Sequence, residues 1–192
     1  MARVSLIEKE QASPEVKEVF QKIEDNGARI LNLYKVAAHS PKVLLNLIRL
    51  GNSIIGRMEL PPRLREMVIL RVATLTGSEY EWAQHVPLAL QVGITQKQLD
   101  AISDWEKSSE FNDEARAILQ YTDEVAKEVN VTDQTFNVLR GLFNEQAIVE
   151  ITITVGYYGM LARLLVPLQV EVDENSAGSA GDLIGQHRAQ KG

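Results

Sequence analysis

Signals that start and stop α-helices follow one another through most of this chain. Ser13 precedes Pro14 and Ser40 precedes Pro41, in each case an N-cap residue followed by the proline that the first helical position favours. Gly77 stands where an apolar helical pattern ends, which is the position that glycine prefers. Together with further caps and periodic apolar residues, these signals predict helices over residues 15–24, 43–54, 63–76, 79–92, 95–102, 112–129, 132–143 and 144–168.

Strand-like alternation of apolar and polar residues is absent between these signals, so we expect an all-α fold. Residues 151–155 are β-branched and form the one stretch that also suits a strand. At 192 residues a single core can bury roughly 70% of the surface of the unfolded chain, which favours one domain over residues 1–170. Residues 171–192 are rich in small residues and predict a tail that is flexible or docks on a neighbouring subunit.

The charge balance limits the classes of partner. The formal net charge is −6 and the pI is about 5.2, which argues against a nucleic-acid binder and favours small molecules or other subunits. The first ten residues become charged before any apolar run reaches the length of a signal peptide, so we expect a cytoplasmic protein. The apolar stretch 147–168 contains Glu150 and Arg163 and is therefore expected to be a buried helix and not a membrane span.

The sequence contains no cysteine, which excludes thiol catalysis, thiolate metal sites and disulfide bonds. A closed metal site needs three or four protein ligands. His39 and His187 lie at no ligand spacing from the third histidine, His85. We therefore expect no bound metal.

Glu66 is the first candidate catalytic residue. Three apolar residues share its helical face, at positions three, four and seven further on: Ile69, Leu70 and Ala73. Burial among such neighbours raises the pKa of a carboxyl and suits it to move protons near neutral pH, unless a cation pairs with it. The alternative is an ion pair with Arg63, Arg65 or an arginine of another helix.

Glu81 and His85 form a second candidate pair, because residues four apart lie one turn from each other on one helical face. A carboxylate beside an imidazole favours the protonated ring or fixes its tautomer, as general acid and base chemistry requires. The same spacing also fits a pair on a solvent-exposed face or half of a metal site. Trp82, on the same helix, is either a core residue or a platform for a substrate.

Three segments carry a family resemblance. They are Arg63-Leu-Arg-Glu66 leading into Leu70-Arg-Val-Ala73, Gly77-Ser-Glu-Tyr-Glu-Trp-Ala-Gln-His85, and Gly93-Ile-Thr95. In these segments the chain resembles the carboxymuconolactone decarboxylase family within the alkylhydroperoxidase D-like superfamily, over roughly residues 10–168. The resemblance implies an alkylhydroperoxidase D-like helical bundle, assembled as a homotrimer or homohexamer, with an active site close to a subunit interface.

The peroxidase branch of that superfamily has a glutamate, then a Cys-x-x-Cys pair, then a histidine four positions after the second cysteine. Glu66 and His85 match the glutamate and the histidine, whereas Ser78 and Glu81 stand at the cysteine positions. Peroxide reduction needs a nucleophilic thiolate and a resolving thiol. The chain is therefore excluded as a thiol peroxidase.

The first functional hypothesis is a cofactor-free lyase resembling carboxymuconolactone decarboxylase, acting on a small anionic lactone or keto compound. His85 would donate or accept the proton, Glu81 would orient it or act as a second acid, and Glu66 would be a buried acid/base or proton relay. A substrate carboxylate would need an arginine, either Arg71 or Arg163. The predicted substrate-binding residues are Ser78, Trp82 and Arg71.

The second hypothesis is a non-catalytic, oligomeric helical protein that binds a small ligand. In that case the aliphatic stripes of the helices over residues 62–75 and 147–168 would serve subunit contacts. Turnover of lactones or keto acids would distinguish an enzyme from such a binder.

Overall fold

The computed structural model describes residues 2–173, and every regular element within that range is a helix. The first elements are η1 (Lys9–Gln11), α1 (Pro14–Asp25), α2 (Asn32–Ala37) and α3 (Pro41–Arg57). They are followed by α4 (Pro62–Thr76), α5 (Glu79–Gln91), α6 (Gln96–Ala101), η2 (Ile102–Lys107), α7 (Asp113–Glu128), α8 (Asp133–Leu142) and α9 (Glu145–Leu165). The all-α prediction is confirmed, whereas the expectations for residues 174–192 lie outside the described residues.

Side-chain caps confirm most of the predicted helix starts. Six residues accept a hydrogen bond from the backbone N–H three positions later: Ser13, Ser78, Thr95, Asn112, Thr132 and Asn144. Ser40 makes no such bond, although α3 begins at Pro41 as expected. Gly77 ends α4 in the left-handed conformation, with φ 63°. The short helix α2 is missing from the predicted elements, because its N-cap residue, Leu31, has no side-chain acceptor to signal a start.

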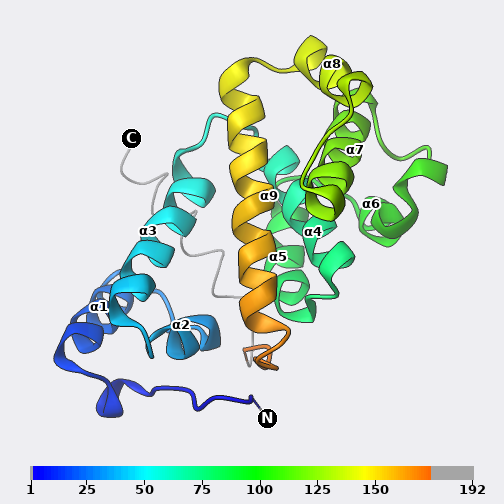
Figure 1. Cartoon of the computed structure of the whole chain (residues 1–192). Helices are drawn as coiled ribbons and strands as arrows, with labels where there is room; N and C mark the ends of the chain where they lie inside the picture. Colours follow the sequence, from blue (N-terminus) through cyan, green and yellow to red (C-terminus); the bar gives the residue numbers. More distant parts are fainter. Residues whose placement is uncertain (1, 174–192) are drawn as a thin grey trace.

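Helix α9 runs through the middle of the molecule, with α1, α2 and α3 on one side and α4, α6 and α7 on the other (Figure 1). Helix α4 packs against α5, α7 and α9, and its residues from Leu64 to Ala73 are all buried. A helix that is apolar on most sides is buried, and the charged residues of α4 within this stretch are paired inside the molecule. The hypothesis that the aliphatic surface of this helix serves subunit contacts is therefore wrong.

Helix α9 is long and apolar enough to cross a membrane, but half of its apolar stretch is buried inside the molecule. Its one buried acid, Glu150, accepts hydrogen bonds from the backbone N–H groups of Glu59 (3.1 Å) and Leu60 (2.7 Å), just before α4. The carboxylate therefore ties the start of α4 to α9. The prediction of a buried helix is therefore met on one face of α9, while apolar side chains of another face are exposed.

The segment after α9 returns to the N-terminal helices. The carboxylate of Asp173 accepts hydrogen bonds from the backbone N–H of Asn32 (2.8 Å), from Gln84 Nε2 (3.0 Å) and from the Tyr80 hydroxyl. The backbone carbonyl of Glu171 accepts a further bond from Asn32 Nδ2 (3.1 Å). These bonds connect α2 with α5, which are the helices that hold the candidate site.

Candidate functional site

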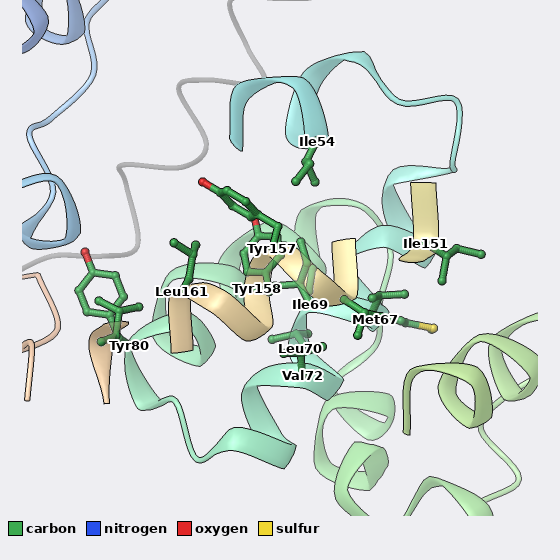
Figure 2. Packing of buried hydrophobic residues seen from close by; sticks show 14 of the residues in the cluster. Ile54, Met67, Ile69, Leu70, Val72, Tyr80, Ile151, Tyr157, Tyr158 and Leu161 are labelled. Atoms are coloured by element: carbon green, nitrogen blue, oxygen red, sulfur yellow. The ribbon is translucent and has the colours of Figure 1, made fainter. Parts of the chain in front are cut away.

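A cavity of about 80 Å³ lies between α2 and α3 on one side and α5 and α9 on the other. We call it the Glu81 cavity. Figure 2 shows two of its tyrosines, Tyr157 and Tyr158 of α9, lying between α3 and α4. Its wall is mostly aliphatic and aromatic, and its side chains with polar groups are Tyr34, Asn52, Tyr80, Glu81, Gln84, His85, Tyr157 and Tyr158. A larger groove of about 940 Å³, formed by η2, α7 and α8, lies away from these residues and is more open.

The imidazole of His85 is held from behind by a buried carboxylate. His85 Nδ1 lies 2.7 Å from Glu66 Oε2, on α4. The other oxygen, Glu66 Oε1, accepts hydrogen bonds from Arg65 Nε (3.2 Å) and Nη2 (3.0 Å). Arg65 Nη1 in turn donates to the backbone carbonyl of Ile55 (2.9 Å). Both oxygens of Glu66 are therefore occupied, and the ion pair with Arg65 is one of the two arrangements that its sequence context allows.

Glu81 lies on the opposite side of the imidazole. Its Oε2 is 3.5 Å from His85 Nε2, which confirms that the two side chains share one face of α5. Glu81 is only 3% exposed, and its Oε1 has no hydrogen-bond partner. A buried acceptor without a partner costs about 1–3 kcal/mol, and such groups recur at functional sites. Glu81 is therefore the residue of this cluster that is not satisfied within the described part of the chain.

The two carboxyls have opposite pKa shifts. Burial alone would raise the pKa of Glu66, but His85 and Arg65 outweigh burial and lower it. Burial raises the pKa of Glu81 to about 7, because the nearby His85 offsets only part of it and Glu66 adds repulsion. Glu66 thus remains a carboxylate at neutral pH, while Glu81 exchanges a proton near neutrality. Of the two alternatives that the sequence left open for Glu66, the structure shows the ion pair with Arg65, and the raised pKa belongs to Glu81.

His85 is held as a cation with a fixed ring. Burial lowers its pKa, but the hydrogen bond and the charge of Glu66, with a smaller contribution from Glu81, raise it above the ordinary value. The ring of Tyr158 meets the imidazole edge-on, with centroids 4.9 Å apart and an interplanar angle of 87°. An imidazolium with Nδ1–H directed at Glu66 leaves Nε2–H as its donor toward Glu81 and the cavity.

The structure places the three predicted substrate-binding residues outside the lining of the Glu81 cavity. Ser78 caps α5, with its hydroxyl accepting from the Glu81 N–H (3.4 Å). Trp82 is half-buried and packs against the core. Arg71 donates from Nη2 to Asp123 Oδ2 (2.6 Å) and from Nη1 to backbone carbonyls of η2, so its charge is already paired. The positions of these residues give no support to a direct substrate contact.

The tyrosines of the cavity wall are the site residues that sequence reasoning missed. Tyr34 lies on α2, the helix that was not predicted, and Tyr157 and Tyr158 lie in the stretch of α9 next to its β-branched residues. None belongs to a spaced motif, so the sequence carries no signal for them. In residues 2–173 no group of three or more histidine and acidic side chains is arranged to hold a metal ion.

The sequence profile of the carboxymuconolactone decarboxylase family matches residues 41–124, which include Glu66, Glu81 and His85. No match was found among curated proteins. A protein of unknown function from Agrobacterium tumefaciens is 25% identical, with 72% of this chain and 96% of its own covered and a TM-score of 0.68.

Two further solved structures are similar over nearly the whole chain. A peroxidase-related protein from Ralstonia eutropha JMP134, with an alkylhydroperoxidase AhpD core, is 15% identical over 93% of this chain and 96% of its own, with a TM-score of 0.79. A cysteine-to-alanine variant of the debrominase Bmp8, in complex with 2,3,4-tribromopyrrole, is 19% identical over 96% and 100%, with a TM-score of 0.71. Residues 41–124 are thus similar to the carboxymuconolactone decarboxylase family, and residues 2–173 have the AhpD-like helical fold.

Proposed function

We propose that the protein is a cofactor-free enzyme that moves protons next to the carbonyl group of a small lactone or keto compound. The observation that carries this proposal is Glu81 Oε1, a buried carboxylate oxygen without a partner, in a residue that lines a cavity beside a cationic histidine. A base and an acid on either side of a small cavity are the two groups that such proton transfers need.

Each residue of the cluster has one role in this proposal. Glu81, as the carboxylate, takes a proton from the carbon beside the carbonyl, and the electron pair of that C–H bond moves onto the carbonyl oxygen. His85 Nε2–H gives its proton to the same oxygen, so the product is an enol. Glu66 is a positioning residue that favours the protonated imidazole, and Arg65 is a positioning residue that orients Glu66.

Decarboxylation is the finer form of the proposal. When a β-keto acid loses CO₂ from its uncharged acid form, the electron pair of the broken C–C bond forms the enol double bond and the acid proton passes to the ketone oxygen. His85 Nε2–H hydrogen-bonds this oxygen. Glu81 in its protonated form then gives a proton to the enol carbon from one oxygen and takes the enol O–H proton with the other, so the product is the ketone. Both steps use groups that the cavity already holds together.

The similarity to a debrominase supports catalysis on this fold, but the debrominase has a cysteine that the present chain lacks. That structure carries an alanine in place of a cysteine, whereas the present chain has no cysteine at all. Any reaction at the Glu81 cavity therefore proceeds without protein sulfur. Acid and base chemistry by carboxyl and imidazole groups meets this condition.

The anionic character expected of the substrate is not part of the proposal. Among the described residues that line the Glu81 cavity there is no lysine or arginine. Arg65, the nearest cation besides His85, is paired with Glu66. A carboxylate bound there would have His85 alone for charge compensation.

The proposal is tested by proton NMR in D₂O. Deuterium uptake next to the carbonyl of a panel of lactones and ketones, and CO₂ release from β-keto acids, are measured for the parent and for Glu81→Gln, His85→Ala and Glu66→Gln. We expect a loss of at least about 100-fold in each variant. Glu79→Gln, an exposed acid on the same helix, is the matched control and should keep the parent rate. If the three variants match the parent on an active compound, the assignment fails; ligands that raise the Tm without turnover would favour the binder.

We also propose that the protein self-associates, as the family resemblance implies. Helix α9 exposes three apolar side chains at helical spacing: Val149 (55%), Ile153 (41%) and Met160 (47%). Analytical ultracentrifugation should find a trimer or hexamer for the parent and a smaller species for Ile153→Glu. A monomeric parent would overturn the proposal.

A further inference from the structure

We propose that the Glu81 cavity selects an uncharged small molecule that donates an O–H or N–H hydrogen bond to Glu81 Oε1, and that it rejects anions of the same size. The inference rests on the proposed function, since it names the class of substrate for the same site. Enols, phenols and N–H heterocycles belong to this class.

Glu81 Oε1 lacks a hydrogen-bond donor among the described residues. Glu81 Oε1 is buried and without a partner, while the nearest positive group, His85 Nε2, lies 3.5 Å from the other oxygen, Oε2. The hydroxyl of Ser78 is directed to the backbone N–H of Glu81 and not to its carboxylate. A ligand that brings an O–H or N–H to Oε1 therefore supplies the one hydrogen bond that the site lacks.

The charges around the Glu81 cavity are mostly negative. Glu81 and Asp173 place two carboxyl groups around the cavity, and the described lining residues include no lysine or arginine. Burial, with smaller contributions from the charges of Glu81 and Asp173, raises the pKa of Tyr34 to about 12. Glu81 also contributes, after burial, to the raised pKa values of Tyr157 and Tyr158. Burial and these carboxylates likewise oppose a ligand anion, and His85 is the one cation among the described lining residues that offsets them.

The volume of the cavity limits the size of the ligand. The Glu81 cavity, about 80 Å³, is smaller than the roughly 150 Å³ cavity known to bind benzene. A second cavity of about 180 Å³, between α1 and α3, shares Leu31, Tyr34 and Asn52 with it. A five-membered ring suits the inner cavity with little adjustment, and a longer apolar body would extend past Tyr34 toward α1.

The test uses three five-membered rings of nearly equal size. Pyrazole is uncharged with an N–H donor, isoxazole is uncharged without one, and tetrazole is ionised at neutral pH. Dissociation constants are measured by NMR titration at pH 8, where Glu81 is ionised. We expect pyrazole to bind at least about tenfold more tightly than either of the other two, as a charge-assisted hydrogen bond requires.

Glu81→Gln should weaken pyrazole binding about tenfold, whereas Glu79→Gln should leave it unchanged within about twofold. The parent provides a test that needs no variant: pyrazole should bind more tightly at pH 8 than at pH 6, because protonation of Glu81 removes the anionic acceptor. A tetrazolate bound to protonated Glu81 would show the opposite trend. The titratable and charged groups around Glu81 are Tyr34, Arg65, Glu66, Tyr80, His85, Tyr157, Tyr158 and Asp173.

The inference is overturned if tetrazole or isoxazole binds as tightly as pyrazole, if Glu81→Gln leaves pyrazole binding intact, or if none of the three rings binds. Its failure is separable from failure of the proposed function. Selective pyrazole binding without any deuterium exchange or decarboxylation would support the ligand class and contradict the enzyme. Exchange activity with an equal or stronger preference for tetrazole would support the enzyme and contradict the ligand class.

Discussion

Two buried ionic clusters, both built on an arginine of α4, differ in how completely they are satisfied. Arg71 binds both oxygens of Asp123 and the carbonyls of Ile102 and Ser103, and Asp123 also receives Lys127. In the other cluster, Arg65 and His85 satisfy Glu66, but Glu81 retains a bare oxygen next to a cavity. The first cluster connects α4, η2 and α7 and leaves nothing for a ligand to complete. The second is completed only by something that enters from outside.

The largest expected effect comes from breaking the satisfied cluster. Asp123→Ala leaves Arg71 buried without its carboxylate, and we expect a loss of about 3–5 kcal/mol in the free energy of unfolding. Asp104→Ala removes an acid from an exposed pair with Lys107 and should cost less than about 1 kcal/mol. Urea unfolding followed by circular dichroism measures both. Equal losses in the two variants would contradict the structural role of the Arg71 cluster.

The unsatisfied cluster should show itself in the pH dependence of stability. The pKa of Glu81 is raised from 4.5 to about 7, so its protonated form favours the folded state and its contribution is lost as pH rises from 4.5 to 7. The pKa of Asp123 is lowered, so its contribution is present above 3.8 and lost as pH falls. Relative to the parent, Glu81→Gln should therefore gain stability between pH 4.5 and 7, by at most about 3 kcal/mol.

Unfolding curves at pH 4.5, 6 and 7.5 check this prediction. The exposed-acid variant Glu79→Gln should follow the parent across the range. A constant difference between Glu81→Gln and the parent at all three values would show that the Glu81 carboxyl has no raised pKa.

A glycine on the cavity wall offers a smaller perturbation. Alanine normally stabilises a helix interior by roughly 1 kcal/mol relative to glycine. At Gly51, however, a Cβ would lie 2.6 Å from the hydroxyl of Tyr157, which donates to the Leu47 carbonyl. We expect Gly51→Ala to cost about 1–2 kcal/mol and to weaken ligand binding. Gly141→Ala, with nothing within 4 Å of its Cβ, is the matched control and should be neutral or stabilising in thermal unfolding.

The smallest expected effect concerns Thr122 Oγ1, which among residues 2–173 is the second buried side-chain atom without a hydrogen-bond partner. Thr122 Oγ1 lies on α7, next to Asp123, and lines no cavity among those described around Glu81. Thr122→Val replaces this hydroxyl by a methyl group, and we expect a gain of up to about 1 kcal/mol with no change in ligand binding or turnover. A loss of ligand binding in Thr122→Val would contradict the assignment of the ligand site to Glu81, because Thr122 does not line the Glu81 cavity.

Local sequence signals predicted most helix boundaries, because capping side chains and Gly77 act on backbone groups within a few residues. They also brought Glu81 and His85 together, since a helix fixes that geometry. The partner of Arg71 was not predictable, because Asp123 is 52 positions away and only helix packing brings them together. The exchange of roles between Glu66 and Glu81 has the same origin: whether Arg65 turns toward its neighbour depends on the surrounding helices.

The contacts of His85 leave only Nε2 free to exchange protons with a ligand. With Nδ1 bound to Glu66 and Tyr158 packed edge-on against it, the ring has no room to turn over. A proton that His85 gives to a ligand therefore leaves from Nε2, and the proton that replaces it must also arrive at Nε2. In the proposed reaction that proton comes back from Glu81, so the ligand atom that loses a proton must lie at Glu81 and the ligand atom that gains one must lie at the Nε2 edge of His85.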